Sequence, residues 1–123
     1  MSDGTAGVQF DKLFASIDTM DTESFLSFIA EDCTFRFGSS PSVAGRDGIG
    51  AAVSDFFSMF AALRHDLMRI VADDKTTVCE GEVTYTRHDG SQITLPFCNV
   101  FEVEAGLISL YRIYIDIGPL FAD

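Results

Sequence analysis

The sequence predicts an α+β fold in which helices cover one face of an antiparallel sheet. In the first half of the 123 residues, apolar side chains recur at helical spacing, whereas in the second half they alternate with polar side chains in four long segments. Apolar residues make up 47% of the chain and include twelve Phe but no Trp. This content argues against disorder, and the length suits one domain with one core, expected to be ordered from about residue 8 to about residue 120.

The first two helices follow from apolar spacing and from a capping residue. Apolar side chains at helical intervals predict a helix across residues 10–17, namely Phe10, Leu13, Phe14 and Ile17. The segment DTMD ends this helix, and Asp21 is placed to cap a second one, Thr22–Ala30.

A short strand, a loop and a long helix complete the first half of the chain. Residues 33–37, CTFRF, alternate as a half-buried strand does, and the turn-rich residues 38–48 form a loop. Asp47 is placed to cap the helix Ile49–Leu63, whose apolar residues make one broad stripe.

The second half of the chain is predicted to be a meander of long strands. The turns DDK, HDG and EAG separate four segments: His65–Ala72, Thr77–Arg87, Gln92–Glu104 and Leu107–Ile117. Since consecutive strands joined by short turns pair side by side, we expect an antiparallel sheet with the helices packed on its apolar face.

The charge and the cysteines exclude several classes of function. The net charge of −11 repels phosphate backbones and anionic lipid, so we expect neither nucleic acid nor a membrane as a partner. No apolar run approaches the roughly 20 residues that span a bilayer, and no secretory signal is visible, so we expect a cytoplasmic protein. Three widely spaced Cys and two His predict no metal site, and we expect reduced thiols and no cofactor.

Asn99 interrupts the apolar face of its strand, LPFCNVFEV. Because side chains alternate along a strand, Asn99 points toward the helices with Phe97 and Phe101. A buried amide left without partners costs about 1–3 kcal/mol, so Asn99 is either a structural amide bonded to backbone or water, or a group that faces a ligand.

The neighbouring strands divide in the same way. Tyr85, Tyr111 and Ile113 share the inward face, where the tyrosine hydroxyls could reach a ligand or could be satisfied within a core. Arg112, Tyr114 and Asp116 phase to the opposite face, where a structural or intersubunit network is expected. A one-residue slip of this strand would exchange its faces and bring them into the cavity instead.

The chain resembles the SnoaL-like branch of the nuclear transport factor 2-like superfamily. The resemblance covers about residues 10–120 and rests on the element order, on AGRDGI opening the long helix, on the His after that helix, on the DG and AGLI turns, and on YRIYID. It implies a cone-shaped α+β fold, a deep cavity between the helices and the concave sheet face, and usually a homodimer. The same fold hosts isomerases, dehydratases, epoxide hydrolases, cyclases and proteins without catalytic activity.

Two catalytic sets known from the superfamily are not present in this sequence. The polar groups of limonene epoxide hydrolases fall on five residues that cannot replace them: Phe35, Phe37, Gly81, Val83 and Ile113. The catalytic Asp of ketosteroid isomerases also falls on Phe37, and their oxyanion-hole Tyr falls on Leu13.

Three positions do carry polar groups that the resemblance relates to catalysis. The second oxyanion-hole donor of ketosteroid isomerases falls on Asn99, whose amide N–H can also donate to a developing enolate. One His of scytalone dehydratase falls on His65, although the second falls on Val83. His65 is a candidate acid or base, or a helix-end His that is bonded to a carbonyl or exposed. Asp116 is a reserve candidate, because SnoaL-like cyclases use an Asp late in the chain.

Three hypotheses follow. In the first, the protein acts on a small, largely apolar, carbonyl-bearing molecule by cofactor-free acid/base chemistry of the isomerase, dehydratase or cyclase type. His65 would move the proton, Asn99 would polarise an oxygen, and Tyr85 or Tyr111 would orient the substrate. The remaining contacts would come from apolar side chains: Phe35, Phe37, Phe97, Phe101 and Ile113. In the second, the cavity binds a ligand without chemistry or is plain core. The third expects a homodimer through the convex sheet face.

Overall fold

A computed structural model describes residues 7–121 of the chain. Three helices occur in this range: α1 (Phe10–Asp18), α2 (Thr22–Leu26) and α3 (Arg46–Ser58). Six strands accompany them: β1 (Ile29–Phe37), β2 (Val43–Ala44), β3 (Ala62–Ala72), β4 (Thr76–Thr86), β5 (Gln92–Glu104) and β6 (Leu107–Tyr114). A 3-10 turn, η1 (Gly118–Phe121), follows β6.

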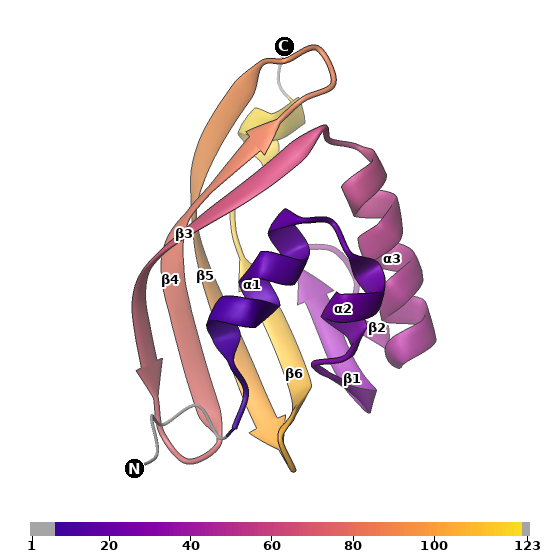
Figure 1. Ribbon diagram of the computed structural model, residues 1–123, viewed down its shortest axis with the longest axis vertical. Helices are drawn as coiled ribbons and strands as arrows, with labels where there is room; N and C mark the ends of the chain where they lie inside the picture. The colour runs from indigo at the N-terminus through magenta and orange to yellow at the C-terminus, as the bar shows by residue number, and fades with distance from the viewer. Residues whose placement is uncertain (1–6, 122–123) are drawn as a thin grey trace.

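The strands form one curved mixed sheet with the order β2-β1-β6-β5-β4-β3. The meander β3–β4–β5–β6 is antiparallel throughout, whereas β1 pairs with β6 in parallel. The helices lie on one side of this sheet, with α3 beyond β1 and β2 and α1 across the middle (Figure 1). The predicted α+β class and the helix-covered face are therefore confirmed.

Tertiary pairing moves several of the predicted boundaries. The second helix ends at Leu26 instead of Ala30, because Ile29 already pairs with Ile108 of β6. Likewise, β3 begins at Ala62 instead of His65, because Ala62 pairs with Thr86 across the β4 ladder. These partners lie far away in the sequence, so local patterns do not reveal them.

Two further boundaries were misplaced. The long helix begins at Arg46 after Gly45 and ends at Ser58, so Asp47 lies in its first turn and is not its cap. The last strand ends at Tyr114 instead of Ile117, and the two-residue strand β2 was not predicted. Asp21 does cap α2 as predicted, because its carboxylate accepts the backbone N–H of Ser24 at 3.1 Å.

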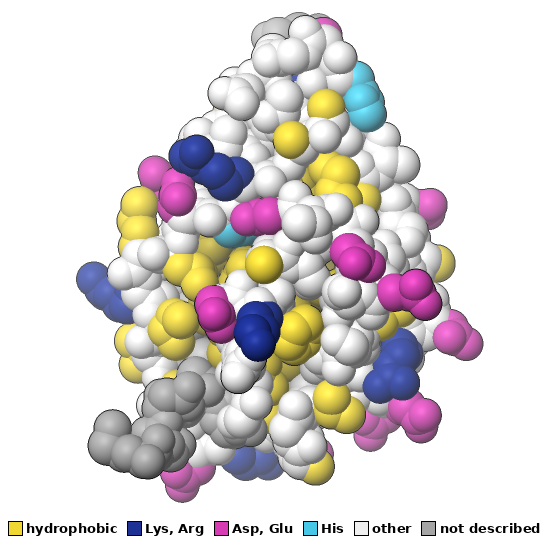
Figure 2. Space-filling view, in the orientation of Figure 1, with side chains coloured by type: hydrophobic (Ala, Val, Ile, Leu, Met, Phe, Trp, Pro, Cys, Tyr) yellow, Lys and Arg dark blue, Asp and Glu magenta, His cyan; other side chains and the backbone are white. Residues whose placement is uncertain are grey.

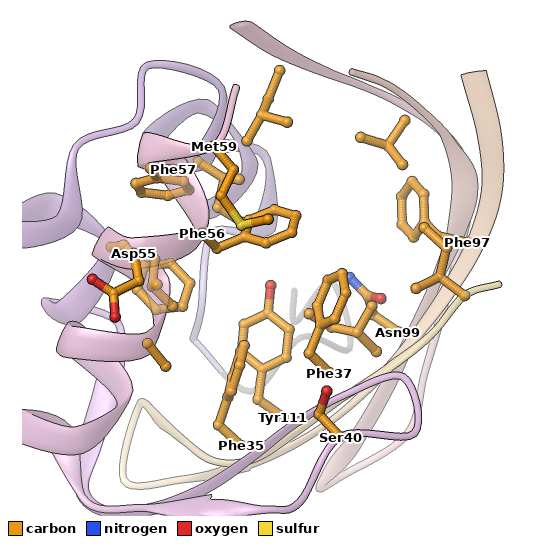
Figure 3. A pocket seen from close by; sticks show the side chains of 18 of the residues that line it. Phe35, Phe37, Ser40, Asp55, Phe56, Phe57, Met59, Phe97, Asn99 and Tyr111 are labelled. Carbon is orange, nitrogen blue, oxygen red and sulfur yellow. The ribbon is translucent and has the colours of Figure 1, made fainter. Parts of the chain in front are cut away.

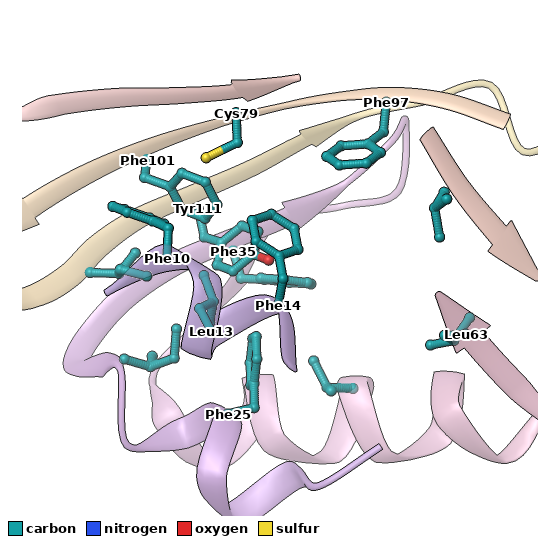
Figure 4. Packing of buried hydrophobic residues seen from close by; sticks show 14 of the residues in the cluster. Phe10, Leu13, Phe14, Phe25, Phe35, Leu63, Cys79, Phe97, Phe101 and Tyr111 are labelled. Atoms are coloured by element: carbon teal, nitrogen blue, oxygen red, sulfur yellow. The ribbon is translucent and has the colours of Figure 1, made fainter. Parts of the chain in front are cut away.

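The predicted strand phases hold, and they place the core. Alternate residues of β4 and β5 are buried, and Asn99 shares the inward face of β5 with Phe97 and Phe101. Figure 4 shows side chains of α1 packed against this face. The ring centroids of Phe10 and Phe101 lie 4.7 Å apart, and those of Phe101 and Tyr111 lie 4.5 Å apart.

Gly81 allows a close contact between β3 and β4 where β3 bulges. The β3–β4 register shifts between Leu67 and Arg69. A Cβ atom at position 81 would come within 2.0 Å of the Asp66 carbonyl oxygen, so only glycine fits there. Bulges bend and twist the strand that carries them, and β3 and β4 curve in Figure 1.

We predict that Gly81→Ala destabilises the protein by about 2–4 kcal/mol, because a backbone contact must open and cannot relax by a side-chain rotation. Gly50→Ala is the control, since a Cβ atom there meets only the end of the flexible Leu26 side chain. That change should alter the free energy of unfolding by less than about 1 kcal/mol. Denaturant unfolding of both variants checks the prediction, and equal effects would contradict it.

Candidate functional site

A cavity of about 340 Å³ lies between the inward face of the sheet and α3. Most of the side chains that line it are aromatic or aliphatic, as Figure 3 shows for ten labelled residues. The polar side chains on the lining are few: Ser40, Asp55, His65, Tyr85, Asn99 and Tyr111. A volume of this size and an apolar wall with few polar groups are typical of small-molecule sites.

Solvent reaches the cavity between α3 and the loop that follows β1. Met59 near the end of α3 and Ser40 in that loop both line the cavity and are exposed. Phe37 and Phe56 lie near this entrance, with ring centroids 4.9 Å apart. The cavity is therefore open to a molecule from solution.

The amide of Asn99 lies in this wall without a protein partner for its oxygen. The residue is 2% exposed, and its Oδ1 atom is buried with no hydrogen-bond partner among residues 7–121. Its neighbours across the sheet are Cys79 on β4 and Ile113 on β6, neither of which can supply a strong donor. Of the two forms of the structural-amide interpretation, a backbone bond to this oxygen does not occur among the described residues, which leaves water or a ligand as its partner.

Tyr111 directs its hydroxyl into the same cavity. Its ring packs against Phe35 and Phe101, and Figure 3 shows the hydroxyl pointing into the cavity. Tyr85 lines the same cavity from β4. Burial raises the pKa of both hydroxyls far above their usual range, so both stay protonated and can donate a hydrogen bond.

His65 lines the cavity from β3 and is held by a carboxylate. Its Nδ1 atom lies 2.6 Å from Oδ1 of Asp18, and its backbone N–H donates to Oδ2 of the same residue at 3.0 Å. The imidazole ring packs against Phe14 and Phe97, with centroid distances of 5.0 and 5.2 Å. The His65 ring is therefore bonded to a side chain and mostly buried, so it is neither bonded to a carbonyl nor exposed as the helix-end alternative expected.

Two predicted site residues lie outside the cavity. Phe101 is fully buried against Phe10 and Tyr111 and belongs to the core. Asp116 follows the end of β6, where it is exposed and accepts the backbone N–H of Gly118 at 3.0 Å. The other predicted residues all line the cavity: His65, Asn99, Tyr85, Tyr111, Phe35, Phe37, Phe97 and Ile113.

Asp18 is the residue that the sequence analysis missed. It ends α1, and 47 positions separate it from His65. One signal could have pointed to it. A carboxylate in the last turn of a helix is disfavoured by the helix dipole, so an acid at that position calls for a specific partner.

The positions that the resemblance relates to polar groups of epoxide hydrolases are apolar here. Phe35, Phe37, Val83 and Ile113 all line the cavity, so no water-activating network can form from these side chains. Within residues 7–121, no group of three or more His, Cys, Asp or Glu is placed to hold a metal ion. Burial raises the pKa of the Cys33 thiol to about 11 and that of Cys79 to about 12, which makes both poor nucleophiles at neutral pH.

Because the Asn99 amide oxygen has no partner to lose, we predict that Asn99→Leu is neutral or stabilising in a thermal melt. The change replaces an unsatisfied amide by an apolar group of similar volume. Thr77→Val is the matched control, since Thr77 carries a second buried oxygen without a described partner but does not line the cavity. Both variants should keep or raise the melting temperature, and only Asn99→Leu should weaken ligand binding. A loss of about 1–3 kcal/mol in Asn99→Leu would show that the amide is structural.

The model of the SnoaL-like domain family matches residues 10–111. No curated protein shows significant sequence similarity to the chain. In the part of the chain that the structure describes, no helix is long and apolar enough to cross a membrane.

Solved structures with the same fold are similar over most of their length. An NTF2-like protein of unknown function from Burkholderia pseudomallei has a TM-score of 0.82 at 17% identity, covering 90% of each chain. A protein from Jannaschia sp. assigned to the SnoaL-like polyketide cyclases has a TM-score of 0.79 at 16% identity, covering 90% of this chain and 85% of that one. An LEH-like epoxide hydrolase from M. tuberculosis has a TM-score of 0.76 at 18% identity, covering 88% and 80%.

At these identities the solved structures establish the fold, and the family model establishes the relationship. Together they match the predicted resemblance and the helix-covered curved sheet described above. The chain belongs to the SnoaL-like domain family and has the cone-shaped α+β fold of NTF2-like proteins.

Proposed function

We propose that the cavity binds a small, largely apolar molecule with one oxygen function, and that the protein acts on it by cofactor-free acid/base chemistry. The observation that carries the proposal is the Asn99 amide, which is 98% buried, faces the cavity and has an oxygen without a described partner. Keeping such a group costs stability unless something outside the chain satisfies it. With the amide turned so that its NH₂ group takes the place of this oxygen, the oxygen of a bound molecule would do so.

The charges favour an uncharged ligand. The cavity lining contains no Lys or Arg among the residues described, so nothing there would neutralise a carboxylate or a phosphate. The chain carries nineteen acids against eight bases, and Figure 2 shows acidic side chains spread over the face in view. Such a surface repels anions before they reach the entrance.

The chemistry would be a proton transfer next to a carbonyl group. His65 would take a proton from the adjacent carbon, and the electron pair of that C–H bond would move to the carbonyl oxygen. Asn99 and Tyr111 would each donate a hydrogen bond to the developing enolate. The ends of the amide can exchange by rotation, so the NH₂ group can turn toward this oxygen.

The proposed base, His65, and the proposed hydrogen-bond donor, Asn99, lie on either side of the Phe97 ring. Phe97 contacts the imidazole of His65, and Asn99 is the next inward residue on β5, about 7 Å further along the strand. A molecule lying over Phe97 could therefore meet His65 at one end and Asn99 at the other. Return of the proton to another carbon would complete an isomerisation. Alternatively, attack of the enolate carbon on a second carbonyl would close a ring, and His65 would return its proton to the alkoxide oxygen formed from that carbonyl.

The family gives partial support to this proposal. One solved structure that is similar to this chain is assigned to the SnoaL-like polyketide cyclases. Cyclisation of a polyketide is chemistry at a carbonyl-bearing molecule, as proposed here. The second candidate function is binding without catalysis. The apolar side chains at Phe35, Phe37 and Val83 favour it, because superfamily enzymes carry polar catalytic groups there.

Binding and turnover of one ligand separate these two functions. Native mass spectrometry of the purified protein, followed by release of any bound molecule, would supply the ligand. We predict that His65→Ala then lowers turnover by about 10²–10⁴-fold with a smaller effect on binding, the range expected for loss of a general acid/base. His88→Ala is the control, because His88 is exposed and bonds the Ser58 carbonyl outside the cavity. Binding without turnover in the unmodified protein would leave the ligand-binding function and remove the catalytic one.

A homodimer through the convex face of the sheet remains a separate proposal. Tyr114 and Met68 lie on the outer side of the sheet and are 54% and 64% exposed. Arg112 and Asp116, also exposed, offer opposite charges that could pair across a two-fold axis.

We predict twice the mass of one chain in light scattering at micromolar concentration, and the mass of a single chain for Tyr114→Glu, which would bury a charge in the interface. A monomeric mass for the unmodified protein would refute the dimer.

A further inference from the structure

We propose that Asp18 is the positioning residue for His65, and that it keeps the ring proton on Nδ1 so that Nε2 is the atom that accepts a proton in the cavity. The catalytic purpose of this arrangement rests on the proposed function. The tautomer of the His65 imidazole does not, and it can be measured without any substrate.

The Asp18 carboxylate bonds His65 through both of its oxygens, an arrangement called the clamp below. One carboxylate oxygen of Asp18 lies 2.6 Å from Nδ1 of His65, and the other accepts the backbone N–H of His65 at 3.0 Å. Both oxygens are thus held by the same residue, one through its main chain and one through its ring. Rotation of the Asp18 side chain away from the ring would also break the backbone hydrogen bond.

The chemistry of the partners fixes the tautomer. An ionised carboxylate can only accept hydrogen bonds, so the ring atom facing it must donate. In the neutral imidazole this places the hydrogen on Nδ1 and leaves the lone pair on Nε2. No hydrogen bond joins Nε2 to any other part of the described chain, and the His65 side chain is 11% exposed. Since His65 lines the cavity and Asp18 does not, Nε2 is the ring nitrogen left for a ligand.

The ring cannot easily turn over to reverse the two nitrogens. Phe14 of α1 and Phe97 of β5 both contact it, and their own ring centroids lie 5.9 Å apart. These contacts restrict rotation of the ring, and the carboxylate would then face a C–H edge. The packing and the clamp therefore select one orientation together.

The position of Asp18 in the sequence supports a specific role. It is the last residue of α1, where the helix dipole disfavours a negative charge, and α1 has no basic residue in its last turn to offset it. A local rule broken without local compensation is typical of functional positions. A residue that only tied α1 to β3 would not need to be ionised or to reach the imidazole ring.

Nitrogen-15 NMR of the imidazole in the full chain tests the assignment, because the two ring nitrogens shift differently in the two tautomers. At a pH where the ring is neutral, we expect His65 to be predominantly in the Nδ1–H form. In Asp18→Asn the amide keeps one oxygen for the backbone N–H and presents an NH₂ group to Nδ1. The ring should then change to predominantly the Nε2–H form.

Asp66→Asn is the matched control, since it removes the same charge one residue from His65 but Asp66 pairs with Arg64 on the surface. Asp66→Asn should leave the tautomer of His65 unchanged. The comparison is made between folded proteins of equal helix content. An Nε2–H tautomer in the unmodified protein, or no change in Asp18→Asn, would overturn the inference.

Turnover provides the readout that separates positioning from structure. With a substrate in hand, Asp18→Asn should lower turnover at least about tenfold while ligand affinity changes little, because the basic nitrogen has moved. If the tautomer changes as expected but His65→Ala leaves turnover intact, the clamp is real and the proposed function is wrong.

Discussion

The curvature of the sheet is the constraint on which the rest of the structure depends. A flat sheet would bring the helices down onto its whole inward face and leave no space. Here β3 bulges beside β4, and the missing side chain of Gly81 lets the Asp66 carbonyl lie where a Cβ atom would otherwise be. The strands then curve around the helices, and α1 packs on one part of the face while α3 stands off another (Figure 1). The cavity lies between the inward face of the sheet and α3.

The polar groups in and beside this cavity are few, and Asn99 and Asp18 each cost the folded protein stability. The Asn99 amide gives up hydrogen bonds to water on burial, and the described chain returns none to its oxygen. Asp18 adds a carboxylate at the wrong end of a helix to hold one imidazole. Proteins keep such costs mainly where function requires them. The same two costs mark the two ends of the proposed site, one at the oxygen of a ligand and one at its proton.

The sequence predicted which face of a strand each side chain occupies better than it predicted the tertiary contacts of that side chain. Alternation along β4 and β5 gave the inward position of Asn99, Tyr85 and Phe97 correctly, because the side-chain period of a strand is a local property. It could not show that Ile29 would leave its helix to pair with β6, since that partner lies 79 positions away. Nor could it separate Phe101 from Phe97. Both face inward, and only the place of α1 decides that Phe101 is core.

Asp18 illustrates the limit most clearly. His65 could be named as a candidate because a residue type and a resemblance pointed to it, but its partner is fixed by the way α1 crosses β3. Contacts of this kind depend on tertiary structure alone. The family relationship supplied the fold and the expected cavity, and the atoms that face the cavity came from the geometry.

A high-resolution crystal structure of the purified protein would test the central claim, that the cavity is a ligand site with Asn99 at its polar end. The account predicts an open cavity in which ordered density, from water or a bound molecule, lies within hydrogen-bonding distance of the Asn99 amide. A cavity closed by its own Phe side chains, with the amide bonded to a protein group, would contradict it.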